Sequence, residues 1–403
     1  MIPAPDGIAE PLTEGRMKRS TDRILTTHAG SMPRPQDLVD MLATKRDGGS
    51  VDEAAFAKRV QEAVDDGVRK QAEAGIDIVS DGEMGKPSFV HYVRDRIAGF
   101  EGVEDVAVTP QRTMSEDFPG YNEWRNRGRS GPNPFGSRPL CIGPLSWKDL
   151  DAVKTDIANF KAALMNVQVE EAFVPCASVG IIAQRLSNKY YTTYEQYVQA
   201  IAEVMRDEYR LVADAGFIVQ IDAPEMCIDR NLPEFRERPM ADFNARQELW
   251  VEALNYALTD VPEDRVRFHV CWGNGEAPHT RDVALKDIVH VVLKVKAQAY
   301  SVEASNPRHA HEWKLWQDVK LPEGKVLIPG VIDSVTNFVE HPELVADRIV
   351  TYANIVGREN VIAGTDCGFG TSAGTENVYP PIVWGKLATL TEGAKLASAQ
   401  LWG

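Results

Sequence analysis

Two short stretches of the sequence place metal-binding side chains at the ends of apolar runs. His269 and Cys271 stand two positions apart in RFHVCWGN, residues 267–274, and Cys367 closes a later run in VIAGTDCGFG. Residues at i and i+2 of a strand point to the same face, so His269 and Cys271 can reach one ion together. With Glu303, which ends a third run, they form a donor set that suits catalytic zinc with one open or displaceable position. A buried cysteine is also a common packing residue, and H-x-C alone leaves that alternative open.

The elements that would position these side chains are strands that alternate with helices. Segments such as 56–75 and 194–216 carry apolar residues at a period of about 3.6 and end in glycine, as helices do. Strand followed by helix, repeated eight times, predicts an α/β fold of the (β/α)8 barrel type. A doubly wound sheet is the alternative, but no glycine-rich dinucleotide turn follows any predicted strand. The predicted strands cover residues 23–31, 76–83, 171–178, 217–225, 266–273, 299–305, 325–333 and 360–368.

Every predicted strand ends in polar side chains. In such a barrel the active site lies at the C-terminal ends of the strands, and polar groups buried there are costly unless they are paired or bind something. Asp222 and Glu225 have the alternative role of capping the helix that follows. The candidates at these ends are His28, Ser31, Asp81, Glu83, Cys176, Ser178, Asp222, Glu225, His269, Cys271, Glu303, Asp333, Asp366 and Cys367.

The remaining cysteines and histidines fit structural roles better than chemical ones. We interpret Cys141, Cys176 and Cys227 as packing residues, because a buried cysteine behaves as a small apolar side chain. His309 and His311, in HAHEW, stand just before a predicted helix. We interpret both as surface or lid residues rather than as ligands.

The chain is predicted to be one barrel domain over residues 22–403, preceded by a disordered leader at 1–21. After the second strand, residues 86–150 have few helical signals and many turn formers, as in YNEWRNRGRSGPNPFGSRP. An irregular insertion of this length is usually a lid or a binding loop, with a decorative flap as the alternative. The run PLCIGPL predicts an extra strand that belongs to the insertion and not to the barrel.

Composition excludes several classes of function. The net charge of -15 argues against a nucleic-acid partner, since phosphate contact needs a basic surface. No stretch approaches the roughly twenty apolar residues that cross a bilayer, and the N-terminus has no apolar core of a secretory signal. Five scattered cysteines among 403 residues do not make a disulfide framework, which favours a reducing cytoplasm. The sequence leaves a homo-oligomer open.

From about residue 22 onward, the chain resembles the C-terminal catalytic barrel of cobalamin-independent methionine synthase. It is also similar to shorter single-barrel relatives, among them the epoxyalkane:coenzyme M transferases. The resemblance lies in the H-x-C pair, a glutamate in SVEAS and a cysteine in TDCG. It implies that His269, Cys271, Glu303 and Cys367 bind Zn²⁺.

The resemblance also implies a thiol-substrate site. The turn Ala29-Gly30-Ser31 is similar to the I-G-S turn of the family, which makes Ser31 a candidate binding residue. Glu83 in SDGEMG and Asp222 in QIDAPE match the two carboxylates that hold the amino group of homocysteine in the methionine synthases.

Two departures from the family pattern affect the proton donor and the folate. The family turn VYDIH carries a histidine that protonates the departing folate nitrogen; here VIDSVTN keeps Asp333 but has Val335 at that position. An acid near Asp333, or His28 at the mouth of the first strand, is therefore the candidate proton donor, with a structural role as the alternative for His28. The N-terminal half of full-length methionine synthase has no counterpart, so this barrel alone would hold a folate.

The predicted function is zinc-dependent thiol alkyl transfer, with a small-molecule thiol and an alkyl donor as partners. The main hypothesis is methyl transfer from a folate-type donor to homocysteine or a related thiol. The alternative is epoxide opening of the epoxyalkane:coenzyme M type, for which Arg34, Arg125 and Arg127 are candidate sulfonate ligands. A binding protein without catalysis is a third hypothesis, which the full ligand set disfavours.

Overall fold

A computed structural model describes residues 16–46, 48–105, 116–126 and 137–403 of the chain. Eight parallel strands form one sheet in the order β1-β13-β12-β11-β10-β9-β7-β2, and each lies within one of the predicted runs. The predicted (β/α)8 barrel is therefore confirmed. The strands are β1 (Leu25–Thr26), β2 (Ile78–Ser80), β7 (Glu171–Ala177), β9 (Ile218–Asp222), β10 (Val266–His269), β11 (Ala299–Glu303), β12 (Val326–Ile332) and β13 (Ile362–Thr365).

Side chains, rather than a ladder, close the barrel between its first and second strands. β1 and β2 stand at opposite ends of the strand order, so the sheet is nearly but not fully closed. The amide of Thr26 in β1 donates to Asp77 Oδ2 (2.8 Å), just before β2. At the other end of the seam, Ser80 Oγ donates to Gly30 O (2.8 Å). The turn that carries Ser31 is thereby tied to β2.

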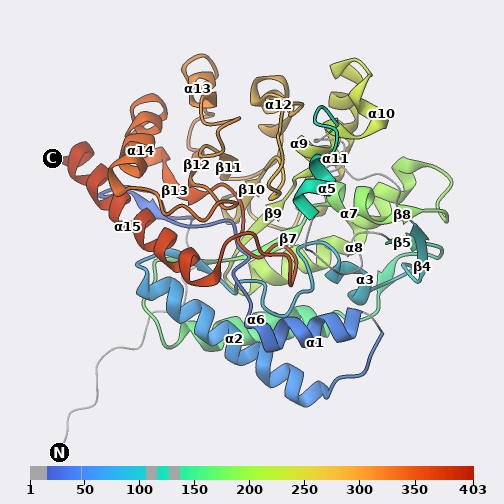
Figure 1. The fold of residues 1–403 in the computed structure, drawn as a ribbon. Coiled ribbons are helices and arrows are strands. Elements are labelled where there is room, and N and C mark those ends of the chain that lie inside the picture. Colours follow the sequence, from blue (N-terminus) through green and yellow to red (C-terminus); the bar gives the residue numbers. More distant parts are fainter. Residues whose placement is uncertain (1–15, 47, 106–115, 127–136) are drawn as a thin grey trace, which may run out of the picture.

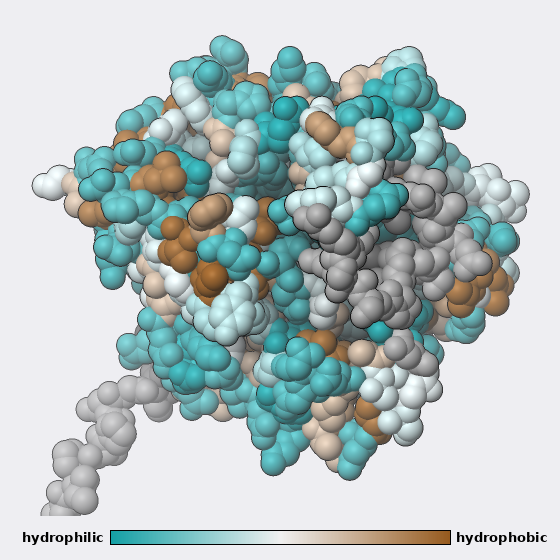
Figure 2. All heavy atoms as spheres, viewed as in Figure 1, coloured by the Kyte–Doolittle hydropathy of each residue, from teal (hydrophilic) through white to brown (hydrophobic). Residues whose placement is uncertain are grey.

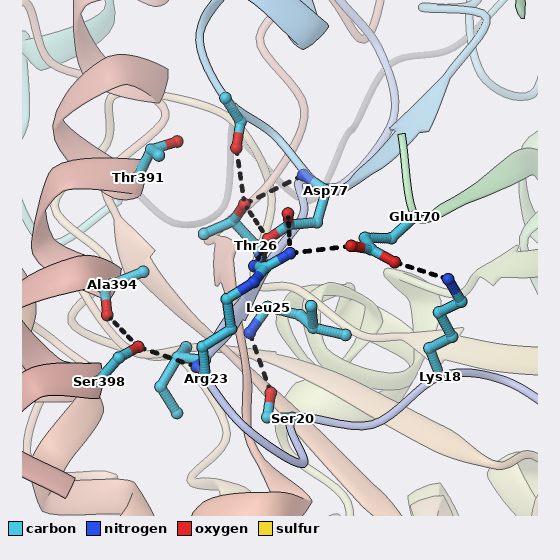
Figure 3. A network of polar contacts seen from close by, with 12 residues as sticks. Lys18, Ser20, Arg23, Leu25, Thr26, Asp77, Glu170, Thr391, Ala394 and Ser398 are labelled. Carbon is cyan, nitrogen blue, oxygen red and sulfur yellow. Dashed lines mark hydrogen bonds and ion pairs between the residues drawn. The ribbon is translucent and has the colours of Figure 1, made fainter. Parts of the chain in front are cut away.

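An ionic network covers the N-terminal ends of the strands near this seam (Figure 3). Arg23 donates to both carboxylate oxygens of Asp77 (2.8 and 2.9 Å) and to Glu170 (3.0 Å). Lys18 forms a second ion pair with Glu170 (2.6 Å). These contacts fix β1, which is only two residues long, against its neighbours.

The barrel begins earlier in the chain than predicted. Met17 is buried in the apolar cluster at the bottom of the barrel. Ser20 is also buried, and its hydroxyl donates to Val361 O (2.5 Å). The predicted disordered leader is therefore wrong for residues 16–21, because Met17 finds an apolar site that sequence periodicity does not reveal. Residues 1–15 of the predicted leader lie outside the described residues.

Helices surround the strands (Figure 1). Their boundaries follow local signals: α8 starts with a capping box of Thr193 and Gln196, and ends before Gly216, whose φ of 91° suits glycine. No helix of the described residues is long and apolar enough to span a membrane. The surface in Figure 2 is mostly hydrophilic, with small separate apolar patches. The helices are α1 (Gln36–Arg46), α2 (Glu53–Glu73), α3 (Tyr92–Arg96), α5 (Tyr121–Asn126), α6 (Asp151–Leu164), α7 (Val179–Arg185), α8 (Tyr194–Asp214), α9 (Glu225–Ile228), α10 (Pro233–Arg236), α11 (Met240–Ala257), α12 (Leu285–Val292), α13 (Leu315–Asp318), α14 (Pro342–Val356) and α15 (Pro380–Trp402), with 3-10 turns η1 (Asp229–Asn231), η2 (Glu263–Arg265), η3 (Glu312–Lys314) and η4 (Arg358–Asn360).

The insertion after β2, together with β8 after α7, builds two small sheets outside the barrel. β3 (Ile97–Ala98) pairs with β6 (Ser146–Trp147), while β5 (Ser137–Cys141) lies between β4 (Gly102–Asp105) and β8 (Ser187–Asn188). The strand predicted in PLCIGPL is therefore present, as the end of β5, and it lies in the insertion.

The described part of the insertion around α5 reaches the loop after β10. Asp117 forms an ion pair with Arg281 and accepts a hydrogen bond from Thr280 Oγ1 (2.8 Å). Tyr121 Oη donates to Glu276 O (2.7 Å). The insertion thus contacts the C-terminal side of the barrel, where a lid would lie.

Candidate active site

Three of the predicted zinc ligands meet at the C-terminal ends of β10 and β13. The ligand atoms of His269, Cys271 and Cys367 all lie within 4.8 Å of one another, and the two sulfur atoms are 3.8 Å apart. All three side chains are buried. The structure therefore brings together residues nearly 100 positions apart, as the strand-end reasoning predicted. We refer to these residues as the ligand trio.

The donor atoms of the ligand trio fit a metal ion. His269 Nδ1 is hydrogen bonded to Ser301 Oγ (3.1 Å), which leaves Nε2 for the ion. This Nε2 is buried and makes no hydrogen bond outside the trio. Contact with Cys367, and then with His269, lowers the pKa of Cys271 well below its usual value. A buried nitrogen without another partner beside an acidified thiol is what zinc coordination would satisfy.

Glu303 is adjacent to the ligand trio but is not part of it. Its Oε1 accepts from Trp272 N (2.7 Å) and its Oε2 accepts from Asn306 Nδ2 (2.9 Å). Burial, and then the charge of Cys271, raise the pKa of Glu303 to about 7. Its place as a fourth ligand stays a prediction.

Glu83 and Asp222 form a second, acidic part of the site. Glu83 adopts a φ of 57°, unusual for a residue with a side chain, and its Oε2 is buried without a hydrogen-bond partner. Burial raises the pKa of Glu83 to about 8 and that of Asp222, at the end of β9, to about 6. Gln220 Nε2 donates to Asp222 Oδ1 (2.7 Å). Burial disfavours the charged form of both carboxyl groups, and a cationic ligand group would favour that form again.

Ser31 joins the first strand turn to the Cys367 turn. Its carbonyl accepts from Phe369 N (2.8 Å), and its Oγ accepts from Gly370 N (3.3 Å). Gly368 packs so closely on Ser31 that a Cβ there would overlap the hydroxyl. The predicted substrate-binding serine thus lies beside the ligand trio.

The two predicted proton donors are both engaged in local hydrogen bonds. His28 accepts from Gly30 N at Nδ1 (3.1 Å) and contacts Gln71 Oε1 through Nε2 (2.7 Å). Burial lowers the pKa of His28 to about 3, so its environment favours the structural role. Asp333 Oδ1 accepts from Val335 N (2.8 Å), and Oδ2 accepts from Thr336 Oγ1, so this carboxylate caps its own turn.

His309 is not a surface residue, and that prediction is wrong. It is 3% exposed and stacks on Trp272 with ring centroids 3.9 Å apart. Burial lowers the pKa of His309, but hydrogen bonds to Asp282 and Glu312 (both 3.0 Å) outweigh this effect and raise the pKa to about 9. Glu312 is only three residues away, but Asp282 belongs to another loop, so a local sequence pattern does not reveal this second partner. His311 is exposed, as predicted.

The other singled-out residues have structural contacts. Cys141, Cys176 and Cys227 are buried, which confirms their packing role. Arg34 is buried as well and donates to Gly370 O and to Glu83 O (2.7 Å), so it braces two loops. Arg127 lies outside the described residues.

One residue of this site had an unrecognised role. Asp366, at the end of β13, accepts three backbone N–H donors from the loop after Glu303. In the sequence it is one of fourteen polar strand-end residues, and no local signal points to the loop that it binds.

The sequence and the fold of this chain are similar to those of known proteins. Residues 24–116 and 188–380 match the family model described as cobalamin-independent synthase, catalytic domain. A methionine synthase from Thermococcus kodakarensis is 25% identical over 379 residues, covering 93% of this chain and 94% of that protein. A 2-hydroxypropyl-CoM lyase from Xanthobacter autotrophicus is 25% identical over 410 residues, covering 94% and 96%. The fold is also similar to that of a B12-independent methionine synthase from Shewanella sp. W3-18-1, solved with selenomethionine, with a TM-score of 0.71, 20% identity and 94% and 99% coverage.

Proposed function

Because the chain belongs to the family of cobalamin-independent synthase catalytic domains, we propose that it is a zinc-dependent methyltransferase. It transfers a methyl group from a folate-type donor to the thiol of homocysteine or of a related amino thiol. The methionine synthase relatives, aligned over most of both chains, support this assignment.

His269, Cys271 and Cys367 hold the zinc ion, with Glu303 as the fourth and displaceable ligand. Bound zinc would lower the pKa of a substrate thiol, so that the nucleophilic thiolate is present at neutral pH. The protein contributes a dry site in which Ser301 fixes the orientation of the His269 ring.

The observation that carries the proposal is the position of the acidic pair beside the ligand trio. Asp222 and His269 are direct partners in the register of β9 and β10. A substrate that carries a thiol and an ammonium group can therefore place its sulfur at the trio and its nitrogen at Glu83 and Asp222. An amino thiol such as homocysteine has both groups.

For the proton that the leaving group takes up, we propose Asp333 rather than His28. Asp333 follows the C-terminal end of β12 and is only half buried, whereas His28 is 2% exposed. Burial lowers the pKa of His28 to about 3, so at physiological pH its ring is neutral and is not the imidazolium that a general acid requires.

A second candidate function is epoxide opening by a thiol of the coenzyme M type. The 2-hydroxypropyl-CoM lyase relative and the valine at position 335 favour it. The acidic pair disfavours it, because a pair of carboxyl groups suits an ammonium group rather than a sulfonate, and the buried Arg34 already donates to two backbone carbonyls.

Zinc-edge X-ray absorption on the purified protein tests the proposal, without a thiol and then with homocysteine or coenzyme M. We expect two sulfur neighbours in the free protein and three with homocysteine. A third sulfur with coenzyme M alone would select the epoxide function. Absence of zinc, or a sulfur count that neither thiol changes, would overturn both.

A further inference from the structure

The carboxylate of Asp366 lies at the junction of three strand ends. It is 3% exposed and receives three backbone N–H donors: Ala304 N (2.8 Å) and Ser305 N (2.9 Å) at Oδ1, and Asn306 N (2.7 Å) at Oδ2. Three backbone N–H donors on the oxygens of one buried side chain fix the backbone of a short loop. The loop concerned is the one that directly follows Glu303.

To reach this loop, the Asp366 side chain crosses over β12. The sheet order places β12 between β13, which precedes Asp366, and β11, which ends in Glu303. Gly330 of β12 is the register partner of Glu303. A Cβ at Gly330 would lie 2.5 Å from the N, Cα and Oδ1 atoms of Asp366, so only glycine leaves room for the crossing. The close approach of Asp366 to β12 therefore depends on the glycine at position 330.

The loop held by Asp366 in turn holds the Glu303 carboxylate. Asn306, whose amide donates to Asp366, donates through Nδ2 to Glu303 Oε2 (2.9 Å). Trp272, the residue after Cys271, donates its amide to the other oxygen. Each carboxylate oxygen has two lone pairs, so both remain able to bind an ion while they accept these bonds.

We propose that Asp366 is a positioning residue that keeps the Glu303 carboxylate beside the ligand trio. Glu303 would then be held in one position, ready to act as the displaceable ligand of a zinc ion bound by the trio. This inference rests on the proposed zinc function, because it assigns a role to a neighbour of the ligands and not a new ligand.

The test measures the zinc dissociation constant of the intact protein by competition with a chromophoric chelator. Asp366→Asn keeps the side-chain size but puts an NH2 group against a backbone N–H. Asn306→Ala leaves Asp366 intact and removes the link to Glu303. Each is expected to weaken zinc binding by about 10–100-fold, as loss of a group that orients a ligand typically does. Ser305→Ala is the matched control, because it removes hydroxyl bonds to Gly330 and Arg348 but keeps the amide bond to Asp366.

A double-mutant cycle separates positioning from a general structural role. If Asp366 acts through Glu303, Asp366→Asn costs little further zinc affinity once Glu303→Ala is present. If Asp366→Asn reduced zinc affinity equally with and without the Glu303 carboxylate, the inference would be overturned. If Asp366→Asn does not fold, Asn306→Ala in the same cycle decides the question. Wild-type protein that binds no zinc overturns the proposed function and this inference together, whereas zinc binding that neither variant weakens overturns the inference alone.

Discussion

Asp222 in β9 and His269 in β10 are register partners in adjacent parallel strands. Neighbouring strands lie about 4.8 Å apart, so Asp222 of the acidic pair and His269 of the ligand trio occupy adjacent positions on the rim of the barrel. That spacing is short enough for one small molecule to reach both. The selectivity of the enzyme is therefore expected to depend on the far end of the thiol substrate as much as on its sulfur.

Loss of either cysteine of the ligand trio should abolish tight zinc binding. Cys271→Ser and Cys367→Ser each remove one soft ligand from a buried site with few alternatives. We expect well below one zinc per chain by elemental analysis after dialysis. Cys227→Ala, a buried cysteine outside the trio, is the control and should keep full zinc. Full zinc in both serine variants would show that the ligand assignment is wrong.

Glu83→Gln should raise the KM for an amino thiol. Removal of a charged hydrogen-bond partner costs about 2 kcal/mol, or about 30-fold in affinity. Steady-state kinetics with homocysteine should show this change mainly in KM. A mercapto acid of the same length without the amino group is the control, and its kinetics should change little. If the variant lost activity equally with both thiols, Glu83 would not be the ammonium ligand.

The stability of the fold should fall as pH rises from about 5 to 8, partly because of Glu225. Burial raises the pKa of Glu225 to about 8, above the value of about 4.3 for an unfolded chain. The folded state then holds a proton that the unfolded state releases, so the stabilisation is complete below pH 4.3 and is lost as pH passes 8. One such proton contributes a slope of at most about 1.4 kcal/mol per pH unit.

Glu225→Gln should remove that part of the slope in urea unfolding measured across this pH range. Its neutral amide can still accept the hydrogen bond from Ser178 Oγ (2.6 Å). Glu195→Gln, at an exposed position of α8, is the control and should keep the wild-type slope. Identical pH profiles for Glu225→Gln and wild type would mean that this carboxyl is ionised in the folded protein.

Gly368→Ala should destabilise the protein through contact with Ser31. The new methyl group would overlap the Ser31 hydroxyl, and overpacking of this kind costs about 1–3 kcal/mol. Combination with Ser31→Ala removes the overlap and should recover much of the loss in a thermal unfolding experiment. Strictly additive losses in the double variant would show that the two turns do not press on each other.

Much of the fold could be predicted because the eight strand runs end in polar groups and alternate with amphipathic helices. The ligand trio followed from the same logic, since residues at the ends of parallel strands meet at one rim whatever their separation in sequence. The sequence pattern could not predict the register between adjacent strands. That Asp222 pairs with His269, and that Gly330 pairs with Glu303, depends on how adjacent strands are aligned.

The errors concern residues whose environment comes from distant loops. His309 was expected at the surface because a histidine before a helix carries no sign of the buried Asp282 that it contacts. Met17 was assigned to a disordered leader because a single apolar residue among polar ones has no periodicity. In both cases at least one partner lies in another segment of the chain, and the folded barrel brings it near.

The seam between β1 and β2 makes the barrel a split ring. Seven junctions are joined by backbone ladders. The eighth is held by side-chain bonds such as those of Thr26 and Ser80, and by the backbone bond from Met32 N to Gly82 O (3.0 Å). The two loops that flank the C-terminal end of this split carry Ser31 and Glu83. A substrate that binds both loops would hold β1 and β2 together. The amide protons of these strands should therefore exchange with solvent more slowly when a thiol is bound than when it is absent.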